Sequence, residues 1–340
     1  MIEILAPAGS PESLKVAAEA GADAVYLGLR SFSARRNAKN FTEDELREAA
    51  RVCRLSGINT DSNQRLESGM PQSTDCRRCR NSAIPVSEQT KFVQKQYKLY
   101  LALNTLIFDR ELPELRRTVQ TAAEAGADAF IIQDLAVLQL VKEVAPDVKY
   151  HASTQMTITS VSGAKAAKKL GFSRVVLARE LSLSEIAEIT RSIDIETEVF
   201  VHGALCTSVS GQCHMSAFFG GSDSVRSANR GLCAQPCRLN FKAHNADYIL
   251  SLKDLSIIKN MKELEKAGVT SVKIEGRMKS PEYVSAAVKA CVKARRGEQY
   301  DEKTLQAIFS RGGFTDGYFT GETCAMRGHR AEENNRGRRK

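Results

Sequence analysis

The sequence predicts an α/β protein folded as a (β/α)8 TIM-like barrel, because one phrase recurs along the chain and eight buried strands can be counted. In the phrase, a helix ends at a glycine, a few small or polar residues follow, and an apolar strand begins. It occurs at residues 19–28, 124–134, 169–180 and 266–277. A glycine just after a helix supplies a left-handed cap, and a short apolar run is typical of a strand buried on both faces. This alternation favours a parallel sheet.

Each candidate strand has a helical pattern before or after it, such as PESLKVAAEA or PELRRTVQTAAEA. The strands are expected at residues 2–5, 24–27, 99–103, 129–132, 149–152, 174–177, 198–201 and 271–274. Eight alternating units are typical of a closed barrel. A doubly wound open sheet is the alternative.

Polar residues gather just past the carboxyl ends of these strands, where a barrel of this kind assembles its active site. The candidates for proton transfer are His151, Glu180, His202 and Glu275. Arg179 and Arg277, with Lys279, suit the carboxylates of an acidic ligand. The alternative is that Arg179 with Glu180, and Glu275 with Arg277, are plain ion pairs at the rim.

One segment interrupts the barrel expected over residues 1–320, and another follows it. Residues 59–97 are polar and irregular, and we interpret them as an insertion. Its Cys76 and Cys79 form half of a zinc site, so a reduced surface pair is expected there. Residues 321–340 are polar and basic without periodicity, and a disordered tail is expected.

Composition sets the class of protein. The chain has 340 residues, 42% of them hydrophobic, and no apolar run long enough to predict a membrane span. The N-terminus shows no secretory pattern, and nine cysteines do not suit a closed disulfide framework, so reduced thiols in a cytoplasm are expected. The net charge of +9 suggests an acidic partner such as RNA, although the basic tail alone could account for it.

Four cysteines fall in one Cys-rich segment, residues 198–241, which begins with the seventh strand. Their spacing is Cys206-x6-Cys213-x19-Cys233-x3-Cys237. Thiolates bind zinc or iron–sulfur clusters. Only the last pair has the close spacing of a zinc knuckle, whereas a cluster accepts uneven spacing because its irons lie at separate corners. An iron–sulfur cluster is favoured, with zinc and unliganded cysteines as alternatives.

Several blocks resemble the collagenase-like peptidase family U-32. The central block is Glu198-x-Phe200-x-x-Gly203-Ala204-Leu205-Cys206-x4-Gly211-x-Cys213, and LAPAGSPESLKVAAEAGADAVYLG, NRGLCAQPCR, LSLKDLS and VKIEGRMKSPEYV match other blocks. The resemblance covers residues 1–58 and 98–320. Some members are described as collagen-degrading proteases. Others are oxygen-independent hydroxylation factors that carry a [4Fe–4S] cluster and modify tRNA, rRNA or ubiquinone.

The resemblance implies that Cys206, Cys213, Cys233 and Cys237 bind a [4Fe–4S] cluster. It also implies an RNA substrate, either tRNA or rRNA, with prephenate supplying the hydroxyl group; it identifies no electron donor. The alternative function is proteolysis by a Cys206–His202 pair, although the sequence has no GxSxG or HExxH motif. A zinc-stabilised RNA-binding barrel without catalysis is the third hypothesis.

Overall fold

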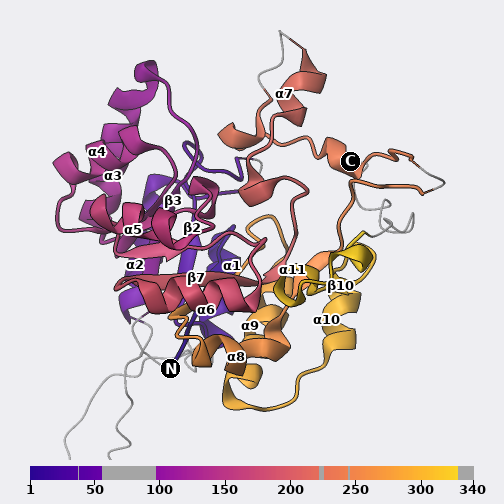
Figure 1. Ribbon diagram of the computed structural model, residues 1–340. Coiled ribbons are helices and arrows are strands. Elements are labelled where there is room, and N and C mark those ends of the chain that lie inside the picture. Colours follow the sequence, from indigo (N-terminus) through magenta and orange to yellow (C-terminus); the bar gives the residue numbers. More distant parts are fainter. Residues whose placement is uncertain (37, 56–96, 222–225, 244–245, 328–340) are drawn as a thin grey trace, which may run out of the picture.

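The structure, a computed structural model, describes residues 1–36, 38–55, 97–221, 226–243 and 246–327. The predicted barrel is confirmed: eight parallel strands form a closed ring. Figure 1 shows strands inside a layer of helices. All eight predicted strands are present. They are β1 (Glu3–Pro7), β2 (Ala24–Leu27), β3 (Lys98–Leu103), β4 (Ala129–Ile132), β5 (Lys149–Ala152), β6 (Arg174–Val176), β7 (Glu196–Gly203) and β9 (Ser271–Ile274).

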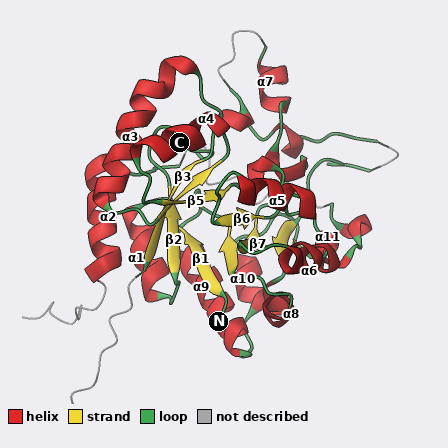
Figure 2. Cartoon of the chain, turned by 60° about the vertical axis from the view of Figure 1, so that its left-hand side comes forward, coloured by secondary structure: helices red, strands yellow, loops and turns green. Residues whose placement is uncertain are grey.

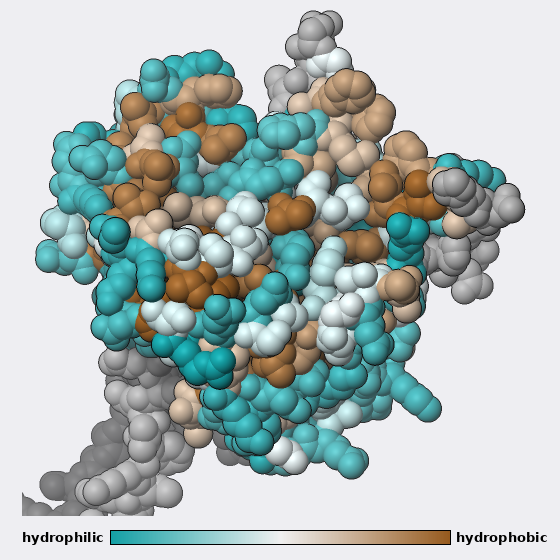
Figure 3. Space-filling view, in the orientation of Figure 1, coloured by the Kyte–Doolittle hydropathy of each residue, from teal (hydrophilic) through white to brown (hydrophobic). Residues whose placement is uncertain are grey.

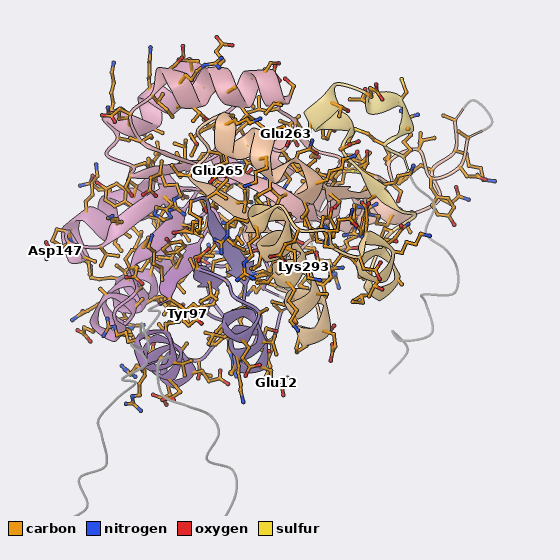
Figure 4. The ribbon with its side chains drawn as sticks, turned by 90° about the horizontal axis from the view of Figure 1, so that it is seen from below. Glu12, Tyr97, Asp147, Glu263, Glu265 and Lys293 are labelled. Carbon is orange, nitrogen blue, oxygen red and sulfur yellow. The ribbon has the colours of Figure 1, made fainter. Side chains whose placement is uncertain are left out.

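Helices surround the ring of strands, as Figure 2 shows from the side. Figure 4 views the molecule from below, with Glu12 and Asp147 at the rim. The helices that follow the barrel strands are α1 (Pro11–Glu19), α2 (Glu43–Leu55), α3 (Leu112–Ala125), α4 (Leu135–Val144), α5 (Val161–Lys169), α6 (Leu183–Ser192), α8 (Met261–Lys266) and α9 (Pro281–Arg296). No helix in the described part of the chain is long and apolar enough to cross a bilayer.

Local sequence fixes where these helices start and stop. Serines begin several of them by accepting a backbone N–H from the first turn, which satisfies a donor that the helix cannot. These serines are Ser10, Ser160, Ser182 and Ser280. The glycine of each recurring phrase has the predicted left-handed conformation, with φ between 89° and 98° at Gly21, Gly126, Gly171 and Gly268. The chain therefore turns from helix to strand without strain.

Two short strands lie outside the predicted set. β8 (Asp254–Ser256) pairs antiparallel with the end of β7, and β10 (Phe314–Thr315) pairs with β8. Such short strands carry too few residues for a hydrophobic period to appear. Three more helices accompany them: α7 (Met215–Gly220) in the Cys-rich segment, and α10 (Glu302–Ile308) and α11 (Gly317–Thr320) after α9.

The predicted insertion and tail fall mostly outside the described residues. Of the insertion, only Tyr97 is described, and its hydroxyl donates to the Ala18 carbonyl at 3.2 Å. Cys76 and Cys79 are not among the described residues. Of the tail, residues 321–327 are described: Met326 is buried, and its carbonyl accepts the Lys253 N–H at 2.8 Å. The packed part of the chain therefore extends to residue 327.

The barrel interior holds a buried network of charged side chains. Glu198 is fully buried and accepts hydrogen bonds from Lys273 at 2.9 Å and Arg174 at 3.0 Å. Arg174 also pairs with Glu3 at 2.6 Å, so the network joins β1, β6, β7 and β9. Burial alone would raise the pKa of Glu198, but Lys273 and Arg174 outweigh it and hold that pKa below its ordinary value. Charges at this depth are tolerable because each has a partner.

We expect Glu198→Gln to lower the free energy of unfolding by about 3–5 kcal/mol, because Lys273 would lose its carboxylate partner inside the barrel and Arg174 would keep only Glu3 and Glu196. Urea denaturation measures this change. The control is Glu143→Gln, which removes a carboxylate paired with Arg116 at 2.9 Å on the surface and should cost about 1 kcal/mol or less. Equal losses in the two variants would contradict a stabilising network.

Candidate active site at the barrel mouth

The carboxyl ends of the strands open into a cavity of about 380 Å³. Its inner end is lined by side chains of the barrel interior, among them Tyr26, Phe200 and Lys273. Its walls come from loops that follow several strands and from the Cys-rich segment after β7. A (β/α)8 barrel places its active site at this end, so the cavity is the candidate site.

All four cysteines of the Cys-rich segment line this cavity: Cys206, Cys213, Cys233 and Cys237. Burial is the main cause that raises the pKa of Cys206; Cys213 and Cys233 add to it, while the Ser208 N–H and Arg179 oppose it. The pKa of Cys237 is raised too, first by burial and then by the other three thiols, against Arg238. The four thiols are therefore close enough to act on one another electrostatically.

Backbone N–H groups point at two of these sulfurs. The Ser208 N–H donates to Cys206 Sγ at 3.4 Å, and the Gln235 N–H donates to Cys233 Sγ at 3.3 Å. Gln235 has a φ of 59°, an unusual left-handed conformation for a residue with a side chain. Hydrogen bonds of this kind stabilise a thiolate that binds a metal and tune the metal's chemistry.

As the side chains lie, no three His, Cys, Asp or Glu residues of the described ranges form a group that could hold a metal ion. The four thiols nevertheless line one cavity. Thiolates hold either a zinc ion or an iron–sulfur cluster, and both stay predictions for these cysteines.

The cavity is strongly cationic. Glu275 is the one carboxylate among the described lining residues, against seven basic side chains: Arg35, Arg179, Arg238, Lys273, Arg277, Lys279 and Arg311. Arg238, Lys273 and Arg277 are buried and the other four are partly buried, and solvent screens such charges less than it screens exposed ones. The cavity therefore attracts anionic ligands.

Glu275 is held in its charged form. Its side chain pairs with Arg35 at 3.0 Å. Burial pushes the pKa of Glu275 upward, but Arg35, Arg179, Lys279 and Arg311 outweigh it and bring that pKa to about 2. Glu275 is therefore a hydrogen-bond acceptor at neutral pH rather than an acid.

The two predicted arginines line the cavity in different ways. The Arg179 guanidinium lies 4.0 Å from the centre of the Phe200 ring, and its buried Nε has no hydrogen-bond partner among the described residues. Burial lowers the pKa of Arg179. Arg277 instead donates to Ser33 Oγ, and burial lowers its pKa to about 10. Arg179 thus has donor capacity left for a ligand.

The other predicted residues lie away from the cavity lining. Glu180 accepts the Ser210 N–H at 3.1 Å. His151 is inside the barrel, edge-on to Tyr100 at 4.8 Å, and the pKa of His151 is lowered well below its ordinary value by burial and then by Arg174 and Lys273. Neither residue lines the cavity.

His202 also lies away from the cavity lining, and a bulge explains its position. The register of β7 with β9 shifts between Phe200 and His202, so Phe200 pairs with Lys273 but His202 pairs with Ile274. His202 therefore packs outside the ring, stacked on Tyr283 at 5.6 Å and edge-on to Phe314 at 5.2 Å. Burial lowers the pKa of His202 to about 4, and neither ring nitrogen has a hydrogen-bond partner among the described residues.

Three arginines of the cavity were missing from the predicted site. Arg35 follows β2 in a loop, and Arg311 follows α10. Arg238 comes directly after Cys237, and that position was the only sequence signal for it. Its guanidinium donates to the Leu252 carbonyl at 2.6 Å and to the Leu205 carbonyl at 3.0 Å, which fastens the Cys-rich segment to the mouth of the barrel.

The depressed pKa of Glu275 predicts a pH-dependent contribution to stability. Its folded pKa of about 2 lies below the ordinary 4.5, so the ionised carboxylate stabilises the fold above pH 4.5, and this is lost as the pH falls from 4.5 towards 2. One pKa unit is worth about 1.4 kcal/mol, so Glu275→Gln should cost on the order of 3 kcal/mol at pH 7 and much less at pH 3. Urea denaturation of the metal-free protein at a series of pH values measures this.

The control is Glu19→Gln, which changes an exposed carboxylate on α1. The difference in free energy of unfolding between wild type and Glu275→Gln should shrink as the pH falls. A difference that stays constant down to pH 3 would contradict a carboxylate that the neighbouring cations keep ionised.

Comparison with known proteins identifies the family. The model of peptidase family U32 matches residues 9–60 and 78–327. A collagenase of Porphyromonas gingivalis is 32% identical over 96% of this chain and 76% of its own length. The tRNA hydroxylation protein P1 of Bacillus subtilis is 31% identical over 84% of this chain and 61% of its own length. A 23S rRNA 5-hydroxycytidine synthase of Escherichia coli is 35% identical, over 83% of this chain but 37% of its own length. With its cysteine-lined barrel mouth, the chain belongs to peptidase family U32.

Proposed function

We propose that this protein is an RNA-modifying enzyme that adds a hydroxyl group to a base of tRNA or rRNA without molecular oxygen. The observation that carries the proposal is the meeting of four cysteines and seven cationic side chains on one cavity. Two relatives whose names state RNA hydroxylation support the substrate class. An RNA substrate and reduced thiols suit a protein of the cytoplasm.

The proposed cofactor is a [4Fe–4S] cluster on Cys206, Cys213, Cys233 and Cys237. Thiolates are the ligands that such clusters use, and the N–H groups of Ser208 and Gln235 already point at two of the sulfurs. All four cysteines line the same cavity of about 380 Å³, which has room for a bulky group. When bound, the cluster would supply electron transfer.

Hydroxylation exchanges a base C–H for C–OH, which oxidises the base by two electrons. If the oxygen comes as a hydroxyl group from an organic donor, that donor is reduced by two electrons and the exchange balances. An acidic donor such as prephenate would place its carboxylates against the cationic side chains. Arg179 Nε, which has no hydrogen-bond partner in the described part of the chain, would donate to one of them. Glu275, as a carboxylate, would accept a hydrogen bond from an N–H group of the base.

A peptidase is the second candidate, because the collagenase of P. gingivalis is similar along nearly the whole chain. Cysteine proteolysis requires a base in contact with the thiol. Cys206 Sγ accepts the Ser208 N–H, while His202 packs outside the ring of strands. The described geometry therefore favours the RNA-modifying proposal.

The proposed cofactor predicts the iron content of cysteine variants. Wild-type protein reconstituted anaerobically with iron and sulfide should bind about four of each per chain and show thiolate-to-iron absorbance. Cys206→Ala should lose most of both, because one corner of the cluster loses its ligand. Iron, sulfide and absorbance assays measure this. The control is Cys324→Ala, an exposed cysteine outside the cavity, which should match wild type.

Iron-free, colourless wild-type protein after reconstitution would contradict the cofactor. Gelatin cleavage by that iron-free protein, lost in Cys206→Ser, would instead establish the peptidase.

The proposed reaction predicts a missing oxygen atom. Cellular RNA from a strain that lacks this protein should contain one base lighter by one oxygen, as measured by mass spectrometry of nucleosides. A wild-type gene should restore the modification, whereas Arg179→Gln should lower it by about ten-fold or more, since a charge-assisted hydrogen bond to the donor is lost. Arg116→Gln, a surface change, is the control and should restore it fully. RNA of unchanged mass in the deletion strain would refute the reaction.

A further inference from the structure

A group of exposed aromatic rings projects from the Cys-rich segment. Phe218 and Phe219 of α7 are 80% and 58% exposed, and we call them the α7 phenylalanines. Their rings lie 5.5 Å apart, edge to face, and Phe219 lies 6.3 Å from Phe241. Figure 1 shows α7 at the top of the molecule, beyond the barrel, and Figure 3 shows hydrophobic surface at this projection. Neighbouring exposed phenylalanines are typical of a surface that binds a partner or ligand.

The first turn of α7 is part of the cavity wall. Met215 lines the cavity, and Ser216 is buried. The Ser216 hydroxyl accepts the Ala234 N–H at 3.0 Å and lies 3.9 Å from Cys233 Sγ. The short helix is therefore attached to the cysteines through its first turn, while its last turn carries the exposed aromatic rings.

Another exposed phenylalanine at the mouth shows a different arrangement. Phe108, in the loop after β3, has the guanidinium groups of Arg110 and Arg230 each 4.4 Å from its ring centre. Among the described residues, the ring contacts of the α7 phenylalanines are with each other and with Phe241. Their π-faces are thus open to a ligand in a way that the face of Phe108 is not.

The surroundings indicate what that ligand is. The adjoining cavity carries seven cationic side chains, and Arg226 and Lys242 are exposed in the same segment. Single-stranded nucleic acid combines a backbone that follows positive charge with bases that stack on aromatic rings. Pairing with a second copy of the chain is disfavoured because the net charge of +9 makes the copies repel.

We propose that Phe218 and Phe219 stack unpaired bases of the RNA substrate beside the nucleotide that enters the cavity. This inference rests on the proposed function and adds a binding surface to it. Bases next to the target would be held on α7, and the target base would leave the stack, as enzymes that modify a base require.

The test measures RNA binding by fluorescence anisotropy with the full chain under anaerobic conditions. The probes are a labelled oligouridine of about 12 nucleotides and an RNA duplex of the same length. Phe218→Ala/Phe219→Ala should weaken binding of the single strand by about ten-fold or more, because each stacked base is lost, and leave binding of the duplex unchanged.

Matched variants separate stacking from other causes. Phe218→Trp/Phe219→Trp should bind the single strand like wild type, whereas Phe218→Leu/Phe219→Leu should fail like the alanine variant, since leucine is apolar but has no π-face. Leu170→Ala is the control: Leu170 is 37% exposed and directly precedes the glycine that leads into β6, at the opposite end of the barrel.

Each contrary outcome has a distinct meaning. Wild-type protein that binds neither probe would overturn the RNA substrate together with this inference. Equal binding of the single strand by wild type and the alanine variant would overturn the stacking surface alone. Full binding by the leucine variant would overturn stacking in favour of a generic apolar contact. A dimer that becomes a monomer in the alanine variant, seen by sedimentation, would make α7 a self-association surface and overturn the inference.

Discussion

The antiparallel pairing of β8 with the end of β7 is the constraint on which the site depends. Because β7 and β9 are parallel neighbours, the chain leaves β7 at the mouth of the barrel and enters β9 at the opposite end, with residues 204–270 between them. The pairing of β8 with β7 returns the chain to the mouth after the four cysteines. Arg238 strengthens this attachment by donating to the carbonyls of Leu205, just after β7, and Leu252, just before β8. The four cysteines are thereby held over the open end of the strands.

The charged interior of the barrel connects stability with the site. Lys273 is held by Glu198 within the ring and also lines the inner end of the cavity. An apolar interior would end the cavity on hydrocarbon, whereas here the inner end carries a fixed positive charge beside the rings of Tyr26 and Phe200. Holding that charge requires Glu198, which in turn requires Arg174. The network requires charged groups to be desolvated in the core, which costs free energy. Through Lys273 it also places a positive charge at the inner end of the cavity.

The sequence contained enough information for the barrel, and for part of the site. Recurring glycines and apolar runs locate the eight strands because each is a local signal with its own physical cause. Cysteine spacing and the positions of the strand ends predicted a shared site for the four thiols and for Arg179, Glu275 and Arg277. All of these residues line the cavity. His202 could not be placed in this way, because a bulge in β7 reverses its side and no residue pattern marks that bulge. Arg35 and Arg311 were missed because they come from irregular loops, whose path depends on tertiary contacts rather than on period.

The balance of charge in the cavity relates the proposed occupants to one another. Seven basic side chains and one carboxylate leave an excess of positive charge in the cavity, and burial lowers the pKa of Arg179 and of Arg277. A cluster on four thiolates, an acidic hydroxyl donor and an RNA phosphate each bring negative charge to this place. Each of them would therefore neutralise part of the positive charge of the cavity. A neutral peptide backbone would not. Glu275 remains ionised among these cations, so it offers an acceptor for a base N–H while the anions occupy the basic side chains.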